Sequence, residues 1–289
     1  MFHARKIAAA AGLAGWLLCA CATLDEDAAR VRARFGATAG VADLQGALGF
    51  QIGQSGVVNP VGGSTLGDLG LEDGDTAPGF EVEVDLGSPR LILSSVVTGS
   101  SGSGVLTDQF ELLDDQNGFG TEFIRFEPGT ELASTLDLAV HRAVLMFGVV
   151  GTETFDAALG FGLEAVDIEG TFRGQAALYD PGGQVGPEEL RSARIDSLLP
   201  LPVVAASVSK DLGSFRLEGD LRWIEATSGS KDASVLGFGL AARFGPWRYF
   251  DAVVGYRSSR MDISYQSGGQ SAVVDVELTG PFVGFGLSF

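Results

Sequence analysis

The stretch FDAALGFGLE at residues 155–164 alternates between two kinds of side chain from its first residue to its last. Apolar residues fill the odd positions, whereas acidic residues, alanine and glycine fill the even positions. Because successive side chains of a strand point to opposite faces, this period of two predicts a β-strand with one apolar face and one small or polar face.

The same alternation recurs at intervals through the chain. About ten strands are expected, an even number as in bacterial single-chain transmembrane barrels. The alternative is eight strands, in which case the first run would form a plug or an accessory hairpin. The expected strands lie at residues 44–52, 80–86, 90–97, 132–148, 155–169, 203–210, 215–225, 235–244, 249–265 and 272–289.

The connections between these runs alternate between short and long. Long connections are expected at 54–78, 99–130 and 171–200, and the Gly-rich part of the second, Gly99–Gly104, is interpreted as flexible loop. Transmembrane barrels have short periplasmic turns and longer external loops. A periplasmic start would place every short turn on that side. We therefore predict an all-β, antiparallel up-and-down transmembrane barrel.

Composition agrees with a barrel and excludes other classes. The 289 residues have a mean hydropathy of only +0.23, and beyond the N-terminus there is no run of the ~18 apolar residues that a membrane-spanning helix needs. The formal net charge is −18. Nucleic acid is therefore not an expected partner, because its phosphates require a basic surface.

The first residues predict export. Arg5 and Lys6 precede an apolar run at 7–20, which has the length of a signal-peptide core and is too short to span a bilayer as a helix. Leu18-Cys19-Ala20-Cys21 resembles the lipobox of bacterial lipoproteins, which implies acylation of Cys21. Ordinary cleavage after Ala22 is the alternative. The expected division is a signal peptide at 1–22, a periplasmic tether or short helix at 23–40, and the barrel at 41–289.

The last strand carries a family resemblance. Phe285, Leu287 and Phe289 share one face, and Phe289 is aromatic. This end resembles the terminal strand of Gram-negative outer-membrane β-barrel proteins, in which Gly284, Leu287 and Phe289 match the signal read by the barrel-assembly machinery. Phe282 departs from it, because a polar residue is usual there. The resemblance covers about 41–289 and implies an outer-membrane location, with membrane lipids and the assembly machinery as partners.

Charged residues within the strands are expected to point into the lumen. A narrow lumen is filled by side chains, and buried charges must pair. The set predicts either an ion-paired plug that holds the barrel together or a charge-lined pore or small-ligand site. The expected members are Glu81, Glu83, Asp85, Asp137, His141, Glu164, Arg216, Glu218, Asp220, Arg222, Arg243, Asp251 and Arg257.

Little in the chain predicts catalysis. The only cysteines are Cys19 and Cys21, and the only histidines are His3 and His141. No metal site and no cofactor are expected. Asp137 lies four residues before His141, but the surrounding residues match no motif of omptin-like proteases, lipid A deacylases or outer-membrane phospholipases. No catalytic residue is therefore expected.

These observations predict a non-enzymatic outer-membrane barrel with a structural role, or one that binds or passively passes a small solute. Two alternatives are a membrane-embedded hydrolase, either protease or lipid-modifying, and a surface adhesion protein that binds through its loops.

Overall fold

A computed structural model describes residues 32–52, 64–71, 76–86, 88–113, 123–180, 183–228, 231–246, 249–267 and 270–289. All regular elements in this part are strands. No helix among the described residues is long and apolar enough to cross a membrane. The strands are β1 (Arg32–Gly40), β2 (Asp43–Ile52), β3 (Ser64–Thr65), β4 (Gly79–Asp85), β5 (Arg90–Val105), β6 (Phe110–Leu113), β7 (Phe123–Phe126), β8 (Glu131–Gly151), β9 (Phe155–Asp180), β10 (Gly183–Gln184), β11 (Glu189–Asp211), β12 (Phe215–Ser228), β13 (Lys231–Phe244), β14 (Phe250–Ser267) and β15 (Gln270–Ser288).

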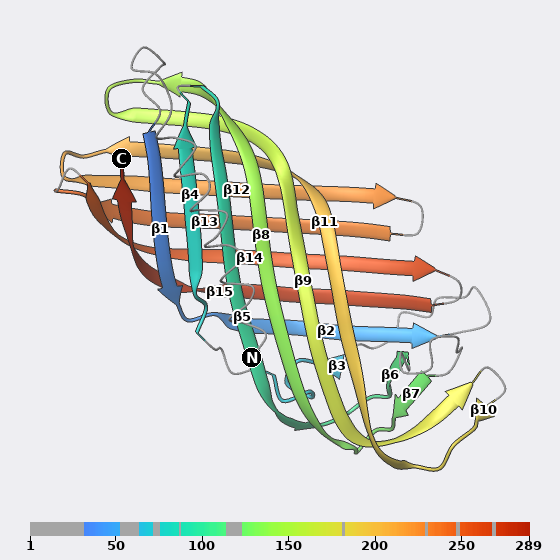
Figure 1. Ribbon diagram of the computed structural model, residues 1–289. Coiled ribbons are helices and arrows are strands. Elements are labelled where there is room, and N and C mark those ends of the chain that lie inside the picture. Colours follow the sequence, from blue (N-terminus) through green and yellow to red (C-terminus); the bar gives the residue numbers. More distant parts are fainter. Residues whose placement is uncertain are drawn as a thin grey trace.

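Ten of these strands form one closed antiparallel barrel, which confirms the predicted fold class and number. Their order is β1-β4-β5-β8-β9-β11-β12-β13-β14-β15, and β15 pairs with β1 to close the ring. In Figure 1 the strands β13, β14 and β15 cross behind β8, β9 and β11, as expected for strands that are tilted around a barrel.

The first barrel strand differs from the prediction made from the sequence. Residues 32–40 form β1, so the prediction of a tether or helix there is wrong, and the remainder of that segment lies outside the described residues. The expected run at 44–52 is present as β2. It continues the direction of β1, since both pair with successive parts of β15.

Two of the expected long loops are largely sheet. β9 continues to Asp180 and β11 begins at Glu189, so the prediction of a loop over 171–200 is wrong. Within 99–130, β5 continues to Val105 and pairs with β8 as far as Glu131, and the hairpin of β6 and β7 follows. The Gly-rich part of β5 is therefore strand rather than flexible loop.

The two ends of the barrel differ. The turn end holds the start of β1, the end of β15 and the short connections 86–89, 152–154, 212–214 and 245–249. The loop end holds the connections that follow β5, β9, β12 and β14. By the rule for transmembrane barrels, the turn end faces the periplasm.

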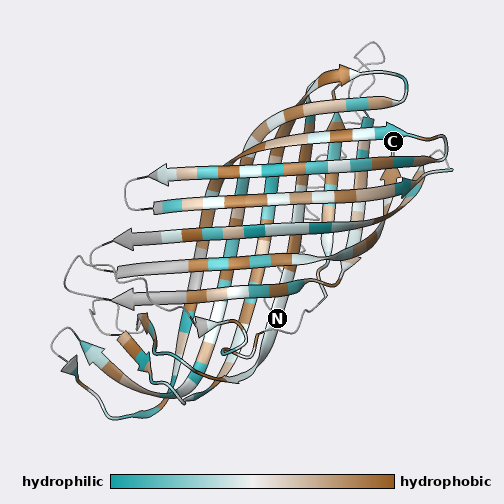
Figure 2. Ribbon diagram, turned by 180° about the vertical axis from the view of Figure 1, so that it is seen from behind, coloured by the Kyte–Doolittle hydropathy of each residue, from teal (hydrophilic) through white to brown (hydrophobic). Residues whose placement is uncertain are grey.

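The polarity of the two faces reverses part-way along the wall, and β9 shows this within one strand. Near the turn end its outward side chains are apolar, from Phe155 to Leu163, and Phe161 is 61% exposed. Toward the loop end the outward positions become polar, whereas the inward Phe172 is fully buried. Figure 2 shows the alternating bands along the strands. The wall therefore passes through lipid near the turn end and projects into water beyond it.

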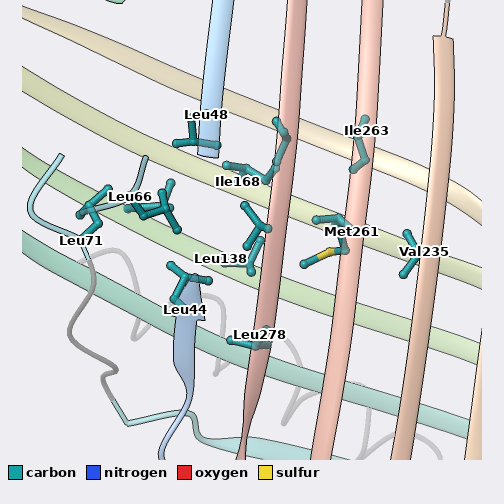
Figure 3. Packing of buried hydrophobic residues seen from close by; sticks show 14 of the residues in the cluster. Leu44, Leu48, Leu66, Leu71, Leu138, Ile168, Val235, Met261, Ile263 and Leu278 are labelled. Atoms are coloured by element: carbon teal, nitrogen blue, oxygen red, sulfur yellow. The ribbon is translucent and has the colours of Figure 1, made fainter. Parts of the chain in front are cut away.

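Packed apolar side chains fill the loop half of the interior. Leu44, Leu48, Leu138 and Met261, each at most 4% exposed, approach one another from opposite walls (Figure 3). The hairpin of β6 and β7 closes this core by pairing with the end of β9, and its Phe110 lies 5.1 Å from Phe172 between ring centroids. This half packs like two sheets face to face rather than like an open tube.

A short segment completes the wall of the loop half. On the loop side of β4, no described strand lies between β2 and β5. Residues 64–71, here called the wedge, occupy this place. The wedge pairs with β2 through β3 and buries Leu66, Leu69 and Leu71 in the core. On its other side it packs against Gly102 and Gly104 of β5, where a side chain would collide with the wedge backbone.

The reversal of polarity predicts opposite outcomes for one substitution at two outward positions of β9. Leu159→Arg should lower the free energy of unfolding by about 2–4 kcal/mol, the cost of arginine in the middle of a lipid-facing wall. Thr171→Arg, which lies in water on the same face of the same strand, should cost close to nothing. Urea unfolding in phospholipid vesicles, followed by tryptophan fluorescence, measures both. Equal losses for the two variants would contradict the assignment of the membrane belt.

Candidate functional site

The turn half of the lumen collects most of the predicted charged residues. Eleven of the thirteen lie on strand faces that point inward. They come from β4, β9, β12, β13 and β14, which surround the same part of the interior. The members are Glu81, Glu83, Asp85, Glu164, Arg216, Glu218, Asp220, Arg222, Arg243, Asp251 and Arg257.

Asp137 and His141 are the two exceptions, and the prediction that they face the lumen is wrong. On β8 the side chains of Leu136 and Leu138 point into the core, so Asp137 points outward, where its pair partner on β9 is Glu169. His141 has the same parity. It is paired with Ser95 and Ala165 on the outer wall, where the wall changes from apolar to polar.

Closest to the turn end, the charges form one continuous series of ion pairs. Arg34 donates to Glu81 at 3.1 Å and to Asp251 at 3.2 Å. Arg243 continues the series by donating to Asp251 at 2.8 Å and to Glu218 at 2.6 Å. Arg90 extends it on the other side through Glu83, at 3.1 Å. The series therefore links strands from β5 to β12 across the mouth of the barrel.

Glycine makes this series possible on β15, the strand between β1 and β14. Gly286 is paired with Gly36 on one side and with Asp251 on the other. A Cβ atom at Gly286 would lie 2.7 Å from a carboxylate oxygen of Asp251 and 2.9 Å from the Arg34 guanidinium. The ion pair thus passes directly over this backbone, and a side chain would push the two partners apart.

A second layer of charge lies deeper, next to the apolar core. Arg222 donates to Glu164 at 2.6 Å, and Glu164 is 0% exposed. Arg142 lies beside this pair. It donates to the Ser94 hydroxyl at 3.1 Å, and its guanidinium lies 3.7 Å from Asp220 across the lumen. One oxygen of Glu164 and the Nε atom of Arg222 have no hydrogen-bond partner among the described residues.

Three arginines of this site were missing from the sequence prediction. Arg34 lies in the segment that was interpreted as tether, and Arg90 and Arg142 lie in strands that were correctly located. Strand alternation could have predicted two of them. Arg90 lies on the face opposite to the outward Leu91 and Leu93, and Arg142 lies on the same face as the inward Val144. For Arg34 the signal was weak, because the outward residues of β1 are mostly alanine.

The charged groups line two neighbouring cavities. The chamber, a cavity of about 230 Å³, lies between Arg34, Arg142, Arg222 and Arg257. A second cavity, of about 270 Å³, lies at the turn end and shares Arg34, Arg216 and Arg243 with the chamber. The second cavity therefore lies between the chamber and the turn end, and the apolar core lies at the other end of the chamber.

The chemistry that this arrangement offers is charge and hydrogen bonding. No group of His, Cys, Asp and Glu that could hold a metal ion occurs among the described residues. The imidazole of His141, the one histidine in the described part of the chain, lies on the outer wall and not in the chamber. The guanidinium groups can bind anions, and the carboxylates can bind cations or donors.

The remaining predicted residues are placed as follows. Gly284 points into the lumen, where a Cβ atom would collide with the backbone of Ala37. Leu287 and Phe289 lie on the outer face, exposed where the lipid would be. Their role in assembly stays a prediction. Cys21 lies outside the described residues.

Comparisons with known proteins support the fold. No family model and no curated protein matches the chain. The outer-membrane protease OmpT from Escherichia coli is similar in structure, with a TM-score of 0.51 and 13% identity over 92% of this chain and 99% of that one. At this identity the likeness concerns the fold alone. The chain has the β-barrel fold of bacterial outer-membrane proteins, and its apolar belt agrees with a location in that membrane.

Other outer-membrane barrels match at lower similarity. The toluene transporter TodX from Pseudomonas putida has a TM-score of 0.31 and 8% identity, over 88% of this chain and 89% of that one. The translocator domain of the autotransporter NalP from Neisseria meningitidis has a TM-score of 0.31 and 12% identity, over 99% of this chain and 98% of that one. Neither value supports an argument about this chain.

The buried pair of the deeper layer gives a testable stability prediction. Arg222→Met leaves Glu164 as an unpaired buried carboxylate, so the free energy of unfolding should fall by about 3–5 kcal/mol. Adding Glu164→Gln removes the unpaired charge and should restore most of this loss. Urea unfolding of the single and double variants in vesicles provides the measurement.

The matched control for this prediction is Arg260→Met. Arg260 forms an ion pair with Asp275 at 3.3 Å on the outer wall and is 61% exposed. Exposed pairs contribute about 0–1 kcal/mol, so this variant should unfold almost like the parent. If Arg222→Met were no more costly than Arg260→Met, the deeper pair would not stabilise the barrel.

Proposed function

We propose that this chain is a non-enzymatic outer-membrane protein that acts as a closed structural barrel. The observation that carries the proposal is the packed apolar core in the loop half of the lumen. The belt fixes the turn half in the membrane, and the loop half then projects from it with a packed core and a polar wall.

The core argues against free passage of water or ions. Beyond Arg257 on the inward face come Ser259 and then Leu278, Met261 and Val235, each no more than 5% exposed. Their counterparts across the lumen are also buried apolar residues, including Ile168. Close-packed protein interiors contain few spaces that admit water. Conduction would require these side chains to separate.

The placement of titratable groups argues against hydrolysis. A nucleophile in a Ser-His or Asp-His arrangement needs a base within about 2.6–3.2 Å. Within the described part of the chain, His141 faces outward from β8, and no side-chain hydrogen bond joins it to Ser95, its neighbour in the pairing register. The carboxylates of the chamber are occupied by arginines, which suits stabilisation of the barrel better than proton transfer.

Planar-bilayer recording tests the proposal. The refolded barrel, shown to be intact by its heat-modifiable migration, should insert without discrete conductance steps, because the core separates the chamber from the loop end. A porin inserted under the same conditions serves as the positive control. Reproducible unitary steps from the intact barrel would overturn the closed-barrel proposal.

Assays with peptide and phospholipid substrates test the non-enzymatic part. We expect no turnover by the refolded protein. Turnover that is abolished by His141→Ala would show that the outer-wall histidine is catalytic and would refute this part of the proposal.

A further inference from the structure

The charges around the chamber are paired near the turn end but not completely at the deep end. Seven arginines line the chamber. Six of them have a carboxylate within 4 Å, and Glu164 and Asp251 are among these partners although they do not line the cavity. Arg257 is the exception among the described residues. Enclosed charge is costly unless it is compensated, so an arginine-rich cavity favours an anionic occupant.

At the deep end the three guanidinium groups of Arg142, Arg222 and Arg257 face two carboxylates, those of Glu164 and Asp220. Arg257 has no carboxylate partner among the described residues. It donates to the backbone carbonyl of Ala77 at 3.1 Å and lies 5.4 Å from the centre of the Phe282 ring. Because each guanidinium carries five N–H donors, most of the donors of Arg257 remain available.

The other two arginines are only partly satisfied. The carboxylate of Asp220 lies 3.7 Å from Arg142, which is beyond hydrogen-bonding distance. Arg222 is paired with Glu164 through one nitrogen, and its Nε atom has no partner among the described residues. Together the three groups can offer a ligand several N–H donors that the protein itself does not use.

Glycines on β13 bring two of these groups together. Gly237 is paired with Arg222, and Gly239 is paired with Arg257. A Cβ atom at Gly237 would lie 2.7 Å from an Arg222 nitrogen. A Cβ atom at Gly239 would collide with the carboxylate of Asp220. The two glycines therefore leave room for charged side chains of the neighbouring strand, and Arg222 and Arg257 both line the chamber.

We propose that the chamber binds a small oxyanion, either a phosphate or a molecule with clustered carboxylates, through Arg142, Arg222 and Arg257. Arginine forms bidentate, charge-assisted hydrogen bonds with both kinds of group. The cavity of about 230 Å³ is large enough for such an ion. This binding goes beyond the proposed structural function.

The route to the site is from the turn end. The second cavity lies at this end, and Arg34, Arg90 and Arg243 line both it and the chamber. The apolar core closes the other direction. The oxyanion therefore enters from and returns to the periplasmic side.

Calorimetric titration of the refolded full-length protein tests the proposal. Inorganic phosphate and citrate are titrated separately, and chloride at the same ionic strength serves as the reference. Saturable binding of one or both is expected. Tighter binding of phosphate would indicate a phosphate ligand, and tighter binding of citrate would indicate a ligand with clustered carboxylates. Arg257→Gln should weaken that binding at least tenfold, whereas Arg260→Gln, a change of the same kind on the outer wall, should leave it unchanged. If Arg257→Gln does not refold, Arg257→Lys keeps the charge but loses the bidentate geometry, and it should weaken binding several-fold.

Two results would overturn the proposal: heats for phosphate and citrate that do not differ from chloride, or equal affinities for the Arg257 and Arg260 variants. These outcomes are separate from those for the closed barrel. A silent bilayer without oxyanion binding would remove only this inference, whereas conductance steps with intact binding would remove only the structural proposal.

Discussion

The change of solvent along the outside of the wall is the constraint on which this structure depends. Each long strand borders hydrocarbon for part of its length and water for the rest, so its outward face must change character while its backbone continues without interruption. The inward face changes in the opposite sense. Ion-paired arginines and carboxylates lie inside where lipid is outside, and packed leucine, valine and phenylalanine lie inside where water is outside. The site occupies the first of these regions and is closed by the second.

Much of the fold could be predicted from the sequence, because lipid-facing strands alternate with a period of two and always place the apolar residues outward. Strands such as Phe215–Ser228 and Lys231–Phe244 were located to within a few residues. The prediction failed where the apolar residues change from the outward to the inward face. At Gly170–Tyr179 the large or small apolar residues point inward and the polar residues point outward, so a search for an apolar outer face ended the strand too early. β1 was missed because alanines give almost no contrast between its faces.

The candidate site could be predicted in composition but not in detail. Strand parity correctly indicated that Arg216, Glu218, Asp220 and Arg222 share the lumen. It could not indicate that Arg142 reaches across to β12, because this contact depends on which walls oppose each other after closure. Strand parity also could not show that His141 points away from the lumen. In this part of β8 the inward face is the apolar one, and this became clear only from the buried core residues. The role of glycine was equally hidden: Gly286 and Gly237 make room for guanidinium groups that belong to other strands.

The wedge makes one part of the wall different in kind from the rest. Elsewhere each barrel strand is held on both sides by a backbone ladder, but the wedge is bonded to β2 and only packs against β5, with Asp68 accepting a hydrogen bond from Thr107 as its side-chain link to the far side. Segments held by few backbone bonds open at lower free energy than the sheet around them. Amide protons in residues 64–71 can therefore exchange with solvent while the ten-stranded ring stays intact. The projecting half of the barrel then opens by local unfolding of the wedge, and its other strands stay paired.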